Sequence, residues 1–118
     1  MIFVDTGAWY ASLVPTDPDH TRAVQWLAAN HSPFLRVRGE RQRALLLGAK
    51  FFNQELAEIH KITSTDLTLA WEIFEQFDDK NWSFTDCTSK VVIEQLSIKV
   101  AFAFDHHFRQ FGTIEVVP

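Results

Sequence analysis

The sequence predicts an α/β protein in which a mostly parallel central sheet is flanked by helices. Two short apolar segments, Ile2–Val4 and Val100–Phe104, each stop at an acidic residue, and uninterrupted apolar runs of this length are typical of strands buried on both faces. Several longer segments between them carry apolar residues at helical spacing. Strands that alternate with helices in this way indicate an α/β sandwich.

Size and composition fit one globular domain that spans residues 1–118. With 118 residues and a mass of 13.6 kDa, the chain is long enough to bury a single core. Apolar residues make up 47% of the chain and charged residues 22%, which excludes disorder as the main state. The net charge of −4 does not indicate a nucleic-acid binder, although a local basic patch is compatible with it.

Several features predict a cytoplasmic protein with no membrane partner. The single cysteine, Cys87, excludes an internal disulfide and a multi-cysteine zinc site, and it indicates a reducing compartment. The first residues include an acid at position 5 and no basic stretch, so they do not resemble a signal peptide. No apolar run approaches the ~20 residues that a membrane-spanning helix needs.

The first half of the chain predicts one strand and then helices. Asp17 and Pro18 are a typical helix start, with Asp as the cap and Pro at the first helical position. The expected elements are a strand at 2–4, a turn at 6–8, a short helix at 9–13, a helix from Asp17 to near Asn30, and a long helix with a wide apolar surface from about Gly39 to Gln54.

The second half alternates helices with strands. The expected elements are a strand within 56–63, a helix capped by residues 64–66, a polar loop at 78–81, a helix that Ser83–Asp86 opens and that runs through Leu96, a strand at 100–104, a short helical turn, and a last strand at 113–117. The helix after residues 64–66 is expected to bury a stripe of Leu67, Ala70, Trp71, Phe74 and Phe77.

Three acidic residues stand where a binding crevice is expected. Asp5 follows the first apolar strand and Asp105 follows the later one, and ligands of open α/β sheets bind at the carboxyl ends of the strands. Asp86 lies in the first turn of an expected helix, where backbone N–H groups and the helix dipole favour negative charge. If the two strands are neighbours in the sheet, the three carboxylates can meet in one hollow.

Such a group of carboxylates is expected to bind a divalent cation. Two carboxylates ~4 Å apart repel each other by roughly 4 kcal/mol at an effective dielectric constant of ~20, so the group must take up protons or a cation. Oxygen ligands select hard ions, which makes Mg²⁺ or Mn²⁺ the expected cofactor. An ion of this kind can generate hydroxide and stabilise the charge that develops during phosphodiester cleavage.

Each acid also has a purely structural interpretation. Asp5 could form an Asx turn with the residues that follow it. Asp86 stands three residues after Ser83, which is the spacing of a helix capping box. Asp105 could cap a short helix that begins at His106. The sequence leaves both interpretations open for each acid, and a capping role does not exclude metal binding.

Three stretches of the sequence resemble the PIN-domain ribonucleases of the VapC toxin type. They are residues 3–10, residues 79–89 and residues 101–112, of which the second is the most specific. The resemblance runs from Ile2 almost to the C-terminus. It implies a PIN-like three-layer sandwich, a pocket of acidic side chains that holds Mg²⁺ or Mn²⁺, and endonucleolytic cleavage of RNA, often by the toxin of a toxin–antitoxin pair.

The resemblance also implies roles for individual residues. Asp5, Asp86 and Asp105 match three acids of the family, which bind the metal and serve catalysis there. Thr85 and Thr6 match neighbouring hydroxyl positions that help to hold the site.

One departure from the family pattern concerns a second acid. The family carries a strand and the start of a helix after the region that corresponds to Pro33, with an essential Glu on that helix. Here Phe34–Leu35 runs almost directly into residues 36–40, so a block that contains this acid is missing and the fold is expected to be shortened in the middle. Glu40 is the nearest acid, but it does not match the motif. The site is therefore expected to have three acids and weakened metal binding.

The sequence predicts a metal-dependent endoribonuclease, and the resemblance implies the toxin component of a type II toxin–antitoxin system. The alternative is a degenerate PIN-like protein, catalytically weak or inactive, that acts by binding an antitoxin or itself. A phosphotransfer receiver or an aspartyl phosphatase is disfavoured, because those proteins need paired acids near the first strand. The expected partners are an RNA substrate, a cognate antitoxin and a second copy of the chain in a homodimer.

Other residues have two interpretations. Four arginines within eight residues either bind the phosphates of an RNA beside the acidic pocket or form a solvated helix face; they are Arg36, Arg38, Arg41 and Arg43. His106 or His107 could reach the pocket or lie at an exposed helix start. The apolar helix from Leu45 to Phe52 is either a dimer or antitoxin face or plainly buried. Cys87 is expected in the core rather than as a nucleophile.

Overall fold

The structure is a computed structural model that describes residues 1–30, 40–54, 58–112 and 114–118. The chain divides into two compact units. The first unit joins residues 1–5 to residues 61–117, and the second consists of residues 6–60 together with Pro118. The expectation of one domain over residues 1–118 stays a prediction.

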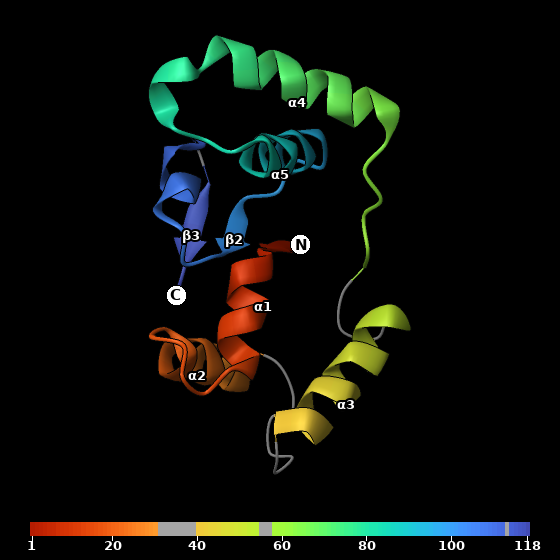
Figure 1. The fold of residues 1–118 in the computed structure, drawn as a ribbon, viewed down its shortest axis with the longest axis vertical. Helices are drawn as coiled ribbons and strands as arrows, with labels where there is room; N and C mark the ends of the chain where they lie inside the picture. The colour runs from red at the N-terminus through yellow and green to blue at the C-terminus, as the bar shows by residue number, and fades with distance from the viewer. Residues whose placement is uncertain (31–39, 55–57, 113) are drawn as a thin grey trace. The chain divides into compact units, whose positions relative to one another are not determined.

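A parallel sheet organises the first unit (Figure 1). Its strands, in spatial order, are β1 (Ile2–Val4), β2 (Val100–Phe102) and β3 (Glu115–Val117). Both strand pairs are parallel, with Ile2 opposite Val100 and Val100 opposite Glu115. The two apolar strands are therefore neighbours, and the predicted α/β class with a parallel sheet is confirmed.

The strands are shorter and less buried than the sequence predicts. β2 ends at Phe102 rather than at Phe104, and β3 begins at Glu115. Ile2 at the start of β1 is 38% exposed, so β1 is not a strand buried on both faces. β1 lies at one edge of the described sheet, which explains why its apolar sequence does not lead to complete burial.

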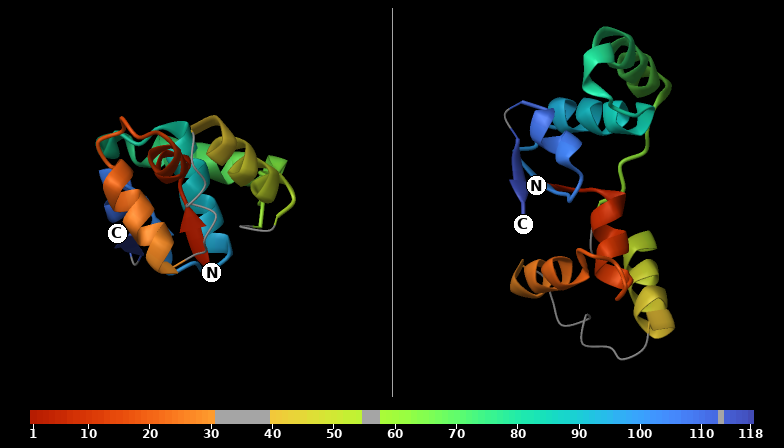
Figure 2. Two further views of the ribbon diagram at one scale, coloured as in Figure 1. Left: turned by 90° about the horizontal axis from the view of Figure 1, so that it is seen from below. Right: turned by 60° about the vertical axis from the view of Figure 1, so that its left-hand side comes forward.

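The first unit also contains two long helices that pack on each other, as Figure 2 shows. They are α4 (Ser64–Gln76) and α5 (Phe84–Gln95). Each begins with a capping box. In α4 the cap is Thr63, one residue earlier than predicted, and its hydroxyl accepts a hydrogen bond from the Asp66 backbone N–H at 3.1 Å. In α5 the cap is Ser83, as the sequence predicts.

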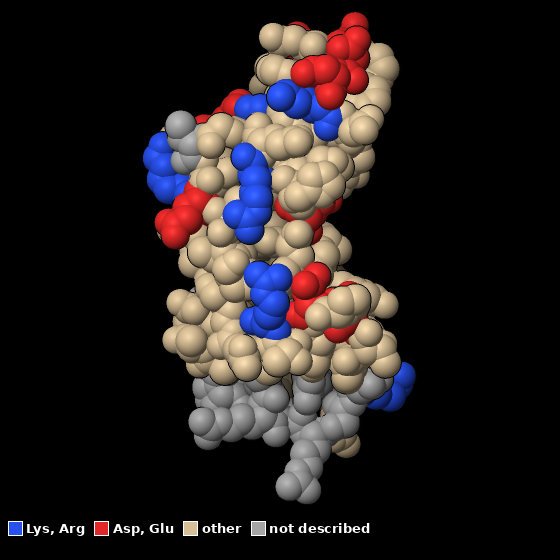
Figure 3. Space-filling model, turned by 90° about the vertical axis from the view of Figure 1, so that its left-hand side faces the viewer, with Lys and Arg blue, Asp and Glu red and all other residues tan. Residues whose placement is uncertain are grey.

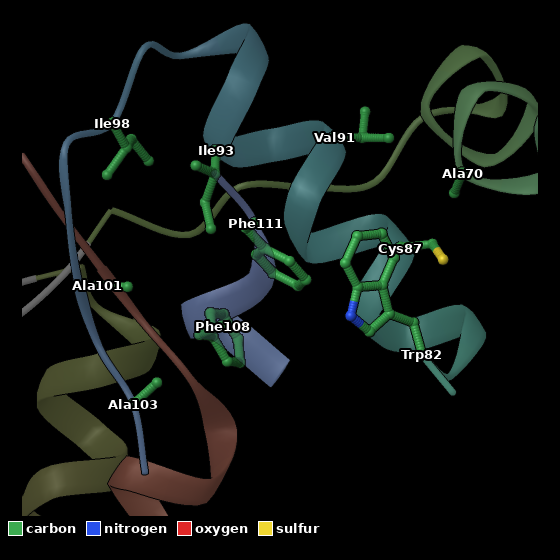
Figure 4. Packing of buried hydrophobic residues seen from close by; sticks show 10 residues of the cluster. All are labelled: Ala70, Trp82, Cys87, Val91, Ile93, Ile98, Ala101, Ala103, Phe108 and Phe111. Atoms are coloured by element: carbon green, nitrogen blue, oxygen red, sulfur yellow. The ribbon is translucent and has the colours of Figure 1, made fainter. Parts of the chain in front are cut away.

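The core of the first unit lies between α5, β2 and the 3₁₀ helix η3 (His106–Gln110), as Figure 4 shows. Trp82 and Phe111 pack edge to face with ring centroids 5.2 Å apart, and the ring of Phe108 lies 4.9 Å from that of Phe111. Cys87 is fully buried beside them, as predicted. This packing fixes η3, and with it residues 105–107, against the end of the sheet.

The predicted buried stripe is confirmed at Ala70, which is fully buried, and in part at Phe77, which is half-buried against the core, and it is wrong at the other three positions. Leu67, Trp71 and Phe74 are 44%, 53% and 40% exposed. In the first unit α4 packs mainly on α5, and the small side chain of Ala70 lets the helices approach closely while larger neighbours lie beside the contact. Trp71 and Phe74 pack instead on the ring of Phe84, 6.4 and 6.2 Å away.

The second unit consists of three helices. They are α1 (Thr6–Leu13), α2 (His20–Asn30) and α3 (Glu40–Phe52). The expected turn at 6–8 is absent from the described chain, because α1 begins directly after Asp5. α2 begins at His20 rather than at Pro18, since Asp17 instead closes a turn by accepting a hydrogen bond from the Asp19 N–H at 2.8 Å.

The expected strand within 56–63 is wrong over residues 58–63, which have no regular secondary structure; residues 56 and 57 lie outside the described residues. Ile62 in this segment is 42% exposed. A loose alternation of apolar residues does not make a strand when no neighbouring strand pairs with it. The expected polar loop at 78–81 contains a short 3₁₀ helix, η2 (Asp78–Lys80).

Burial of Cys87 leads to a testable prediction about its thiol. Desolvation, aided by the negative charge of Asp86 and opposed by Lys90, raises the pKa of Cys87 above its ordinary value of 9.0. Only the thiolate reacts with a disulfide reagent, so modification at pH 8 is expected to be at least about tenfold slower than in the chain unfolded by guanidinium. A rate equal to that of the unfolded chain would contradict the burial.

The same shift predicts a pH dependence. The folded state holds the thiol proton more tightly than the unfolded state, so the free energy of unfolding should fall as the pH rises through 9.0. Cys87→Ser removes the thiol, and the difference between the two unfolding curves across this pH range measures the effect.

Candidate active site

Asp5 and Asp105 lie at the same end of the sheet, beyond the carboxyl ends of two neighbouring strands. Asp5 directly follows β1, and its backbone N–H donates a hydrogen bond of 3.0 Å to the carbonyl oxygen of Phe102, the last residue of β2. Asp105 comes three residues after Phe102. Because β1 and β2 are parallel neighbours, both acids follow the carboxyl ends of their strands, where the sequence predicts a crevice.

Asp86 is held in place by the first turn of α5. Its Oδ2 atom accepts a hydrogen bond of 2.9 Å from the Ser83 N–H, and the Ser83 hydroxyl accepts one of 3.0 Å from the Asp86 N–H. The capping-box interpretation is thus confirmed. Asp86 keeps its second oxygen, Oδ1, without a hydrogen-bond partner among the described residues.

Asp105 is held in the same way at the start of η3. Its Oδ1 atom accepts a hydrogen bond of 2.9 Å from the His107 backbone N–H, which confirms that it caps the short helix. Its Oδ2 atom has no hydrogen-bond partner within the described part of the chain. Both acids therefore anchor one oxygen to the backbone and keep the other available.

His107 brings these two acids together. Its Nδ1 atom lies 3.1 Å from Asp86 Oδ2 and 3.3 Å from Asp105 Oδ1. The sequence left open whether a histidine reaches the pocket or lies at an exposed helix start. The His107 side chain is 19% exposed and lies between the carboxylates, whereas that of His106 is 76% exposed. Only the packing of η3 near α5 decides between the two histidines.

The donor groups of this cluster fit a divalent cation. The Nδ1 atom of His107 is buried and, among the described residues, has no hydrogen-bond partner with acceptable geometry despite its nearness to both carboxylates. Donor atoms of Asp105, His106 and His107 also lie within 4.8 Å of one another. Asp105, His106 and His107 thus offer one carboxylate and two imidazoles, a set of donors that suits divalent transition ions.

The sequence of this chain is similar over its whole length to a characterised nuclease. It is 31% identical, over 131 aligned positions, to the 23S rRNA-specific endonuclease VapC20 of Mycobacterium tuberculosis, in both strain CDC 1551 and strain H37Rv, covering 100% of this chain and 99% of the relative. The crystal structure of VapC20, described as a sarcin–ricin loop cleaving toxin, superposes with a TM-score of 0.78 at 28% identity and covers 100% of both chains. The chain belongs to the VapC family of PIN-domain ribonucleases. No protein-family model matches it.

The alignment supports a shortened chain. It runs over 131 positions, more than the 118 residues present here, so VapC20 carries residues that this VapC-family chain lacks. Residues 31–39, where the sequence indicates the missing block, lie outside the described residues. Glu40 is the first residue of α3, in the second unit.

The other residues that match the VapC family pattern are placed as follows. Thr85 is exposed in the first turn of α5, next to Asp86, and its carbonyl oxygen accepts a hydrogen bond from the Thr88 hydroxyl at 2.7 Å. Thr6 is the first residue of α1. The catalytic and metal-binding roles of Asp5, Asp86, Asp105 and Thr85 stay predictions.

Half of the predicted arginine track lies outside the described structure. Arg36 and Arg38 fall within the undescribed residues, whereas Arg41 and Arg43 lie on α3, where Arg41 is exposed. On the face drawn in Figure 3, the basic side chains of the described residues stand apart from one another and alternate with acidic ones. That face therefore offers scattered charge of both signs rather than one basic patch.

The two capping boxes provide a matched pair of variants. Ser83→Ala removes the hydroxyl that caps α5, and Thr63→Ala removes its counterpart at α4; each is expected to cost about 1 kcal/mol of unfolding free energy. Only Ser83→Ala should also weaken Mn²⁺ binding, because the hydroxyl that it removes fixes the Asp86 backbone N–H in the first turn of α5, whereas the backbone N–H of residue 83 stays bonded to the Asp86 carboxylate in both variants. Urea unfolding and Mn²⁺ titration of both variants measure this, and equal Mn²⁺ affinities would show that the cap does not position the acid.

Proposed function

We propose that this chain is a metal-dependent endoribonuclease that hydrolyses RNA phosphodiester bonds, and that it is the toxin component of a type II toxin–antitoxin system. The observation that carries the proposal is that Asp86 and Asp105 both approach the buried Nδ1 atom of His107, in a chain of the VapC family in which Asp5 and Asp105 follow neighbouring parallel strands. The description of VapC20 as a 23S rRNA-specific endonuclease supports RNA as the substrate class.

The three acids are proposed to bind Mg²⁺ or Mn²⁺. Carboxylates held near each other repel, by roughly 4 kcal/mol for a pair ~4 Å apart at an effective dielectric constant of ~20, and a divalent cation removes this repulsion. The capping bonds at Asp86 and Asp105 fix one oxygen of each side chain before any ion arrives. The site is thus arranged in advance, which lowers the entropic cost of binding.

The chemistry needs an activated water and a stabilised phosphate. When bound, a divalent cation lowers the pKa of a water and neutralises charge on the phosphate. The Thr85 hydroxyl is proposed to donate a hydrogen bond to an oxygen of the substrate, which the exposure of Thr85 beside Asp86 supports. Asp86 and Asp105 hold the ion, and their unpartnered oxygens are the atoms available for it.

A second candidate function is binding without cleavage. It is favoured by the shorter length of this chain relative to VapC20 and by the absence of a residue that matches the second acid of the family. A chain with three acids would hold the cation more weakly, and a degenerate member would act by binding an antitoxin or itself.

Protein partners belong to the proposal. Leu45 and Phe52 on α3 are 59% and 79% exposed, which supports a protein partner for that helix, either the cognate antitoxin or a second copy in a homodimer. Among the described residues, no helix has the length and apolarity needed to cross a membrane. A cytoplasmic location is proposed from the single cysteine, which favours a reducing compartment.

The deciding experiment combines metal binding with RNA cleavage. Mn²⁺ and Mg²⁺ are titrated into nuclease-free protein, thermal unfolding is recorded, and cleavage of total RNA is followed with and without chelator. At an ion concentration 100 times its dissociation constant, the ion should stabilise the fold by about 2.7 kcal/mol. Cleavage that persists in excess chelator would contradict the metal-dependent reaction, and ion binding without any cleavage would favour the second candidate function.

A further inference from the structure

We propose that Gln110 is a positioning residue of the metal site. Its side chain accepts a hydrogen bond from the indole of Trp82, and this bond sets where Asp105 lies relative to Asp86. The inference rests on the proposed function, because it names the contact that arranges two of the acids proposed there to bind the ion. It assigns Gln110 no contact of its own with the ion or with RNA.

The backbone hydrogen bonds that hold the two acids are local. Asp86 Oδ2 accepts a hydrogen bond from the Ser83 N–H, and Asp105 Oδ1 accepts one from the His107 N–H. Bonds of this kind fix each carboxylate on its own helix, α5 or η3, but they do not fix one helix relative to the other. A site that needs both acids therefore also needs a contact that joins the two helices.

Trp82 and Gln110 provide such a contact. The Trp82 Nε1–H donates a hydrogen bond of 2.9 Å to Gln110 Oε1, between side chains that are 28 residues apart in the sequence. Trp82 directly precedes Ser83, the cap of α5. Gln110 is the last residue of η3, the helix that Asp105 caps. The bond therefore joins the start of the helix that carries Asp86 to the end of the helix that follows Asp105.

The surroundings of Trp82 make this bond decisive for the position of η3. Trp82 is 6% exposed, and its ring packs on those of Phe77 and Phe111, each with centroids 5.2 Å away. Apolar packing has no preferred direction, whereas a hydrogen bond weakens steeply when its angle changes. An indole N–H can only donate, and a buried donor that loses its acceptor is costly. Because Gln110 supplies that acceptor, η3 is fixed at one position along the indole.

The spacing of the two acids is the arrangement that this bond preserves. Asp86 Oδ2 and Asp105 Oδ1 lie 3.1 and 3.3 Å from the same atom, His107 Nδ1. Gln110 itself is exposed, so its truncation opens no cavity in the core. Without the bond, both capping bonds should persist while the two helices shift relative to each other. Removal of a group that orients metal ligands typically lowers the metal affinity about 10–100-fold, and we expect the lower end because Gln110 acts through the backbone of η3.

Mn²⁺ binding to the full chain tests the assignment without any activity measurement. Gln110→Leu removes the acceptor at similar size, and it is expected to lower the Mn²⁺ affinity about tenfold. The electron paramagnetic resonance signal of free Mn²⁺ gives this affinity well below the unfolding temperature, where a change in stability alone does not move it. In nuclear magnetic resonance without metal, the Trp82 indole N–H should exchange faster with solvent. Gln95→Leu, the same change at an exposed residue of α5, is the matched control and should leave both measurements unchanged.

A conservative variant separates the hydrogen bond from other effects of the substitution. Gln110→Glu keeps an oxygen that can accept from the indole, so its Mn²⁺ affinity should stay within about threefold of the parent. Because Glu also adds a negative charge, the same change is made together with Trp82→Phe, which removes the donor. In that double variant the affinity should fall to the level of Gln110→Leu, and an affinity equal to the parent would show that the charge, not the hydrogen bond, is responsible.

The outcomes separate this inference from the proposed function. If Gln110→Leu bound Mn²⁺ as tightly as the parent, the positioning role would be overturned and the metal site would stand. Unchanged indole exchange in Gln110→Leu, or an equal loss of affinity in Gln95→Leu, would also overturn that role. Failure of the parent to bind Mn²⁺ at all would contradict the metal site itself.

Discussion

Asp86→Asn is expected to lower RNA cleavage by roughly a hundredfold or more, without unfolding the protein. Asn keeps an oxygen that can accept the hydrogen bond from the Ser83 N–H, so the cap of α5 should survive. The variant loses the negative charge that is proposed to bind the cation, next to His107. Cleavage rates at saturating Mn²⁺, together with the thermal shift that Mn²⁺ produces, measure both consequences.

Asp79→Asn is the control for this prediction. Asp79 has a side chain that is 68% exposed, and it pairs with Lys80 at 3.9 Å on η2. Its replacement makes the same chemical change, and cleavage and the Mn²⁺ shift should match those of the parent. If Asp86→Asn also matched the parent in both measurements, Asp86 would have only its capping role.

Phe108→Ala is expected to destabilise the fold by about 3–5 kcal/mol, which is a large part of the stability of a small protein. Phe108 is 1% exposed and packs on Phe3 and Phe111, with ring centroids 5.7 and 4.9 Å away. Truncation leaves a cavity where η3 meets the sheet. Asp105 and His107 lie just before this anchor in the sequence, so Mn²⁺ affinity should fall together with stability.

The matched control is Phe52→Ala, the same substitution at a side chain that is 79% exposed. Its cost is expected to be about 0.5 kcal/mol or less. Denaturant unfolding of both variants provides the comparison. Equal losses would mean that Phe108 is not a core residue of the folded chain.

The local features of the fold could be predicted from the sequence because short-range chemistry determines them. The apolar runs before Asp5 and Asp105 form strands, and the spacing of Ser83 and Asp86 gives a capping box. VapC family membership, which the motif at 79–89 indicates, is confirmed by the similarity to VapC20.

Features that depend on neighbours distant in the sequence could not be predicted in this way. The apolar face of α4 predicts burial, but in the first unit mainly α5 packs on it, and Trp71 stays 53% exposed. The segment 58–63 has a strand-like pattern but no pairing partner. His107 lies beside Asp86 because the core places η3 near the start of α5. This contact joins residues far apart in the sequence, so the spacing of His and Asp residues does not predict it.

The pairing of β1 with β2 has a consequence for biosynthesis. Ile2 pairs with Val100, so β1 is synthesised long before β2, the strand with which it pairs. Such contacts, distant in the sequence, close late and fold slowly. A nascent chain consequently cannot bring Asp5 to the end of the sheet that Asp105 follows until residues 100–102 have been made, so the proposed metal site forms late in synthesis.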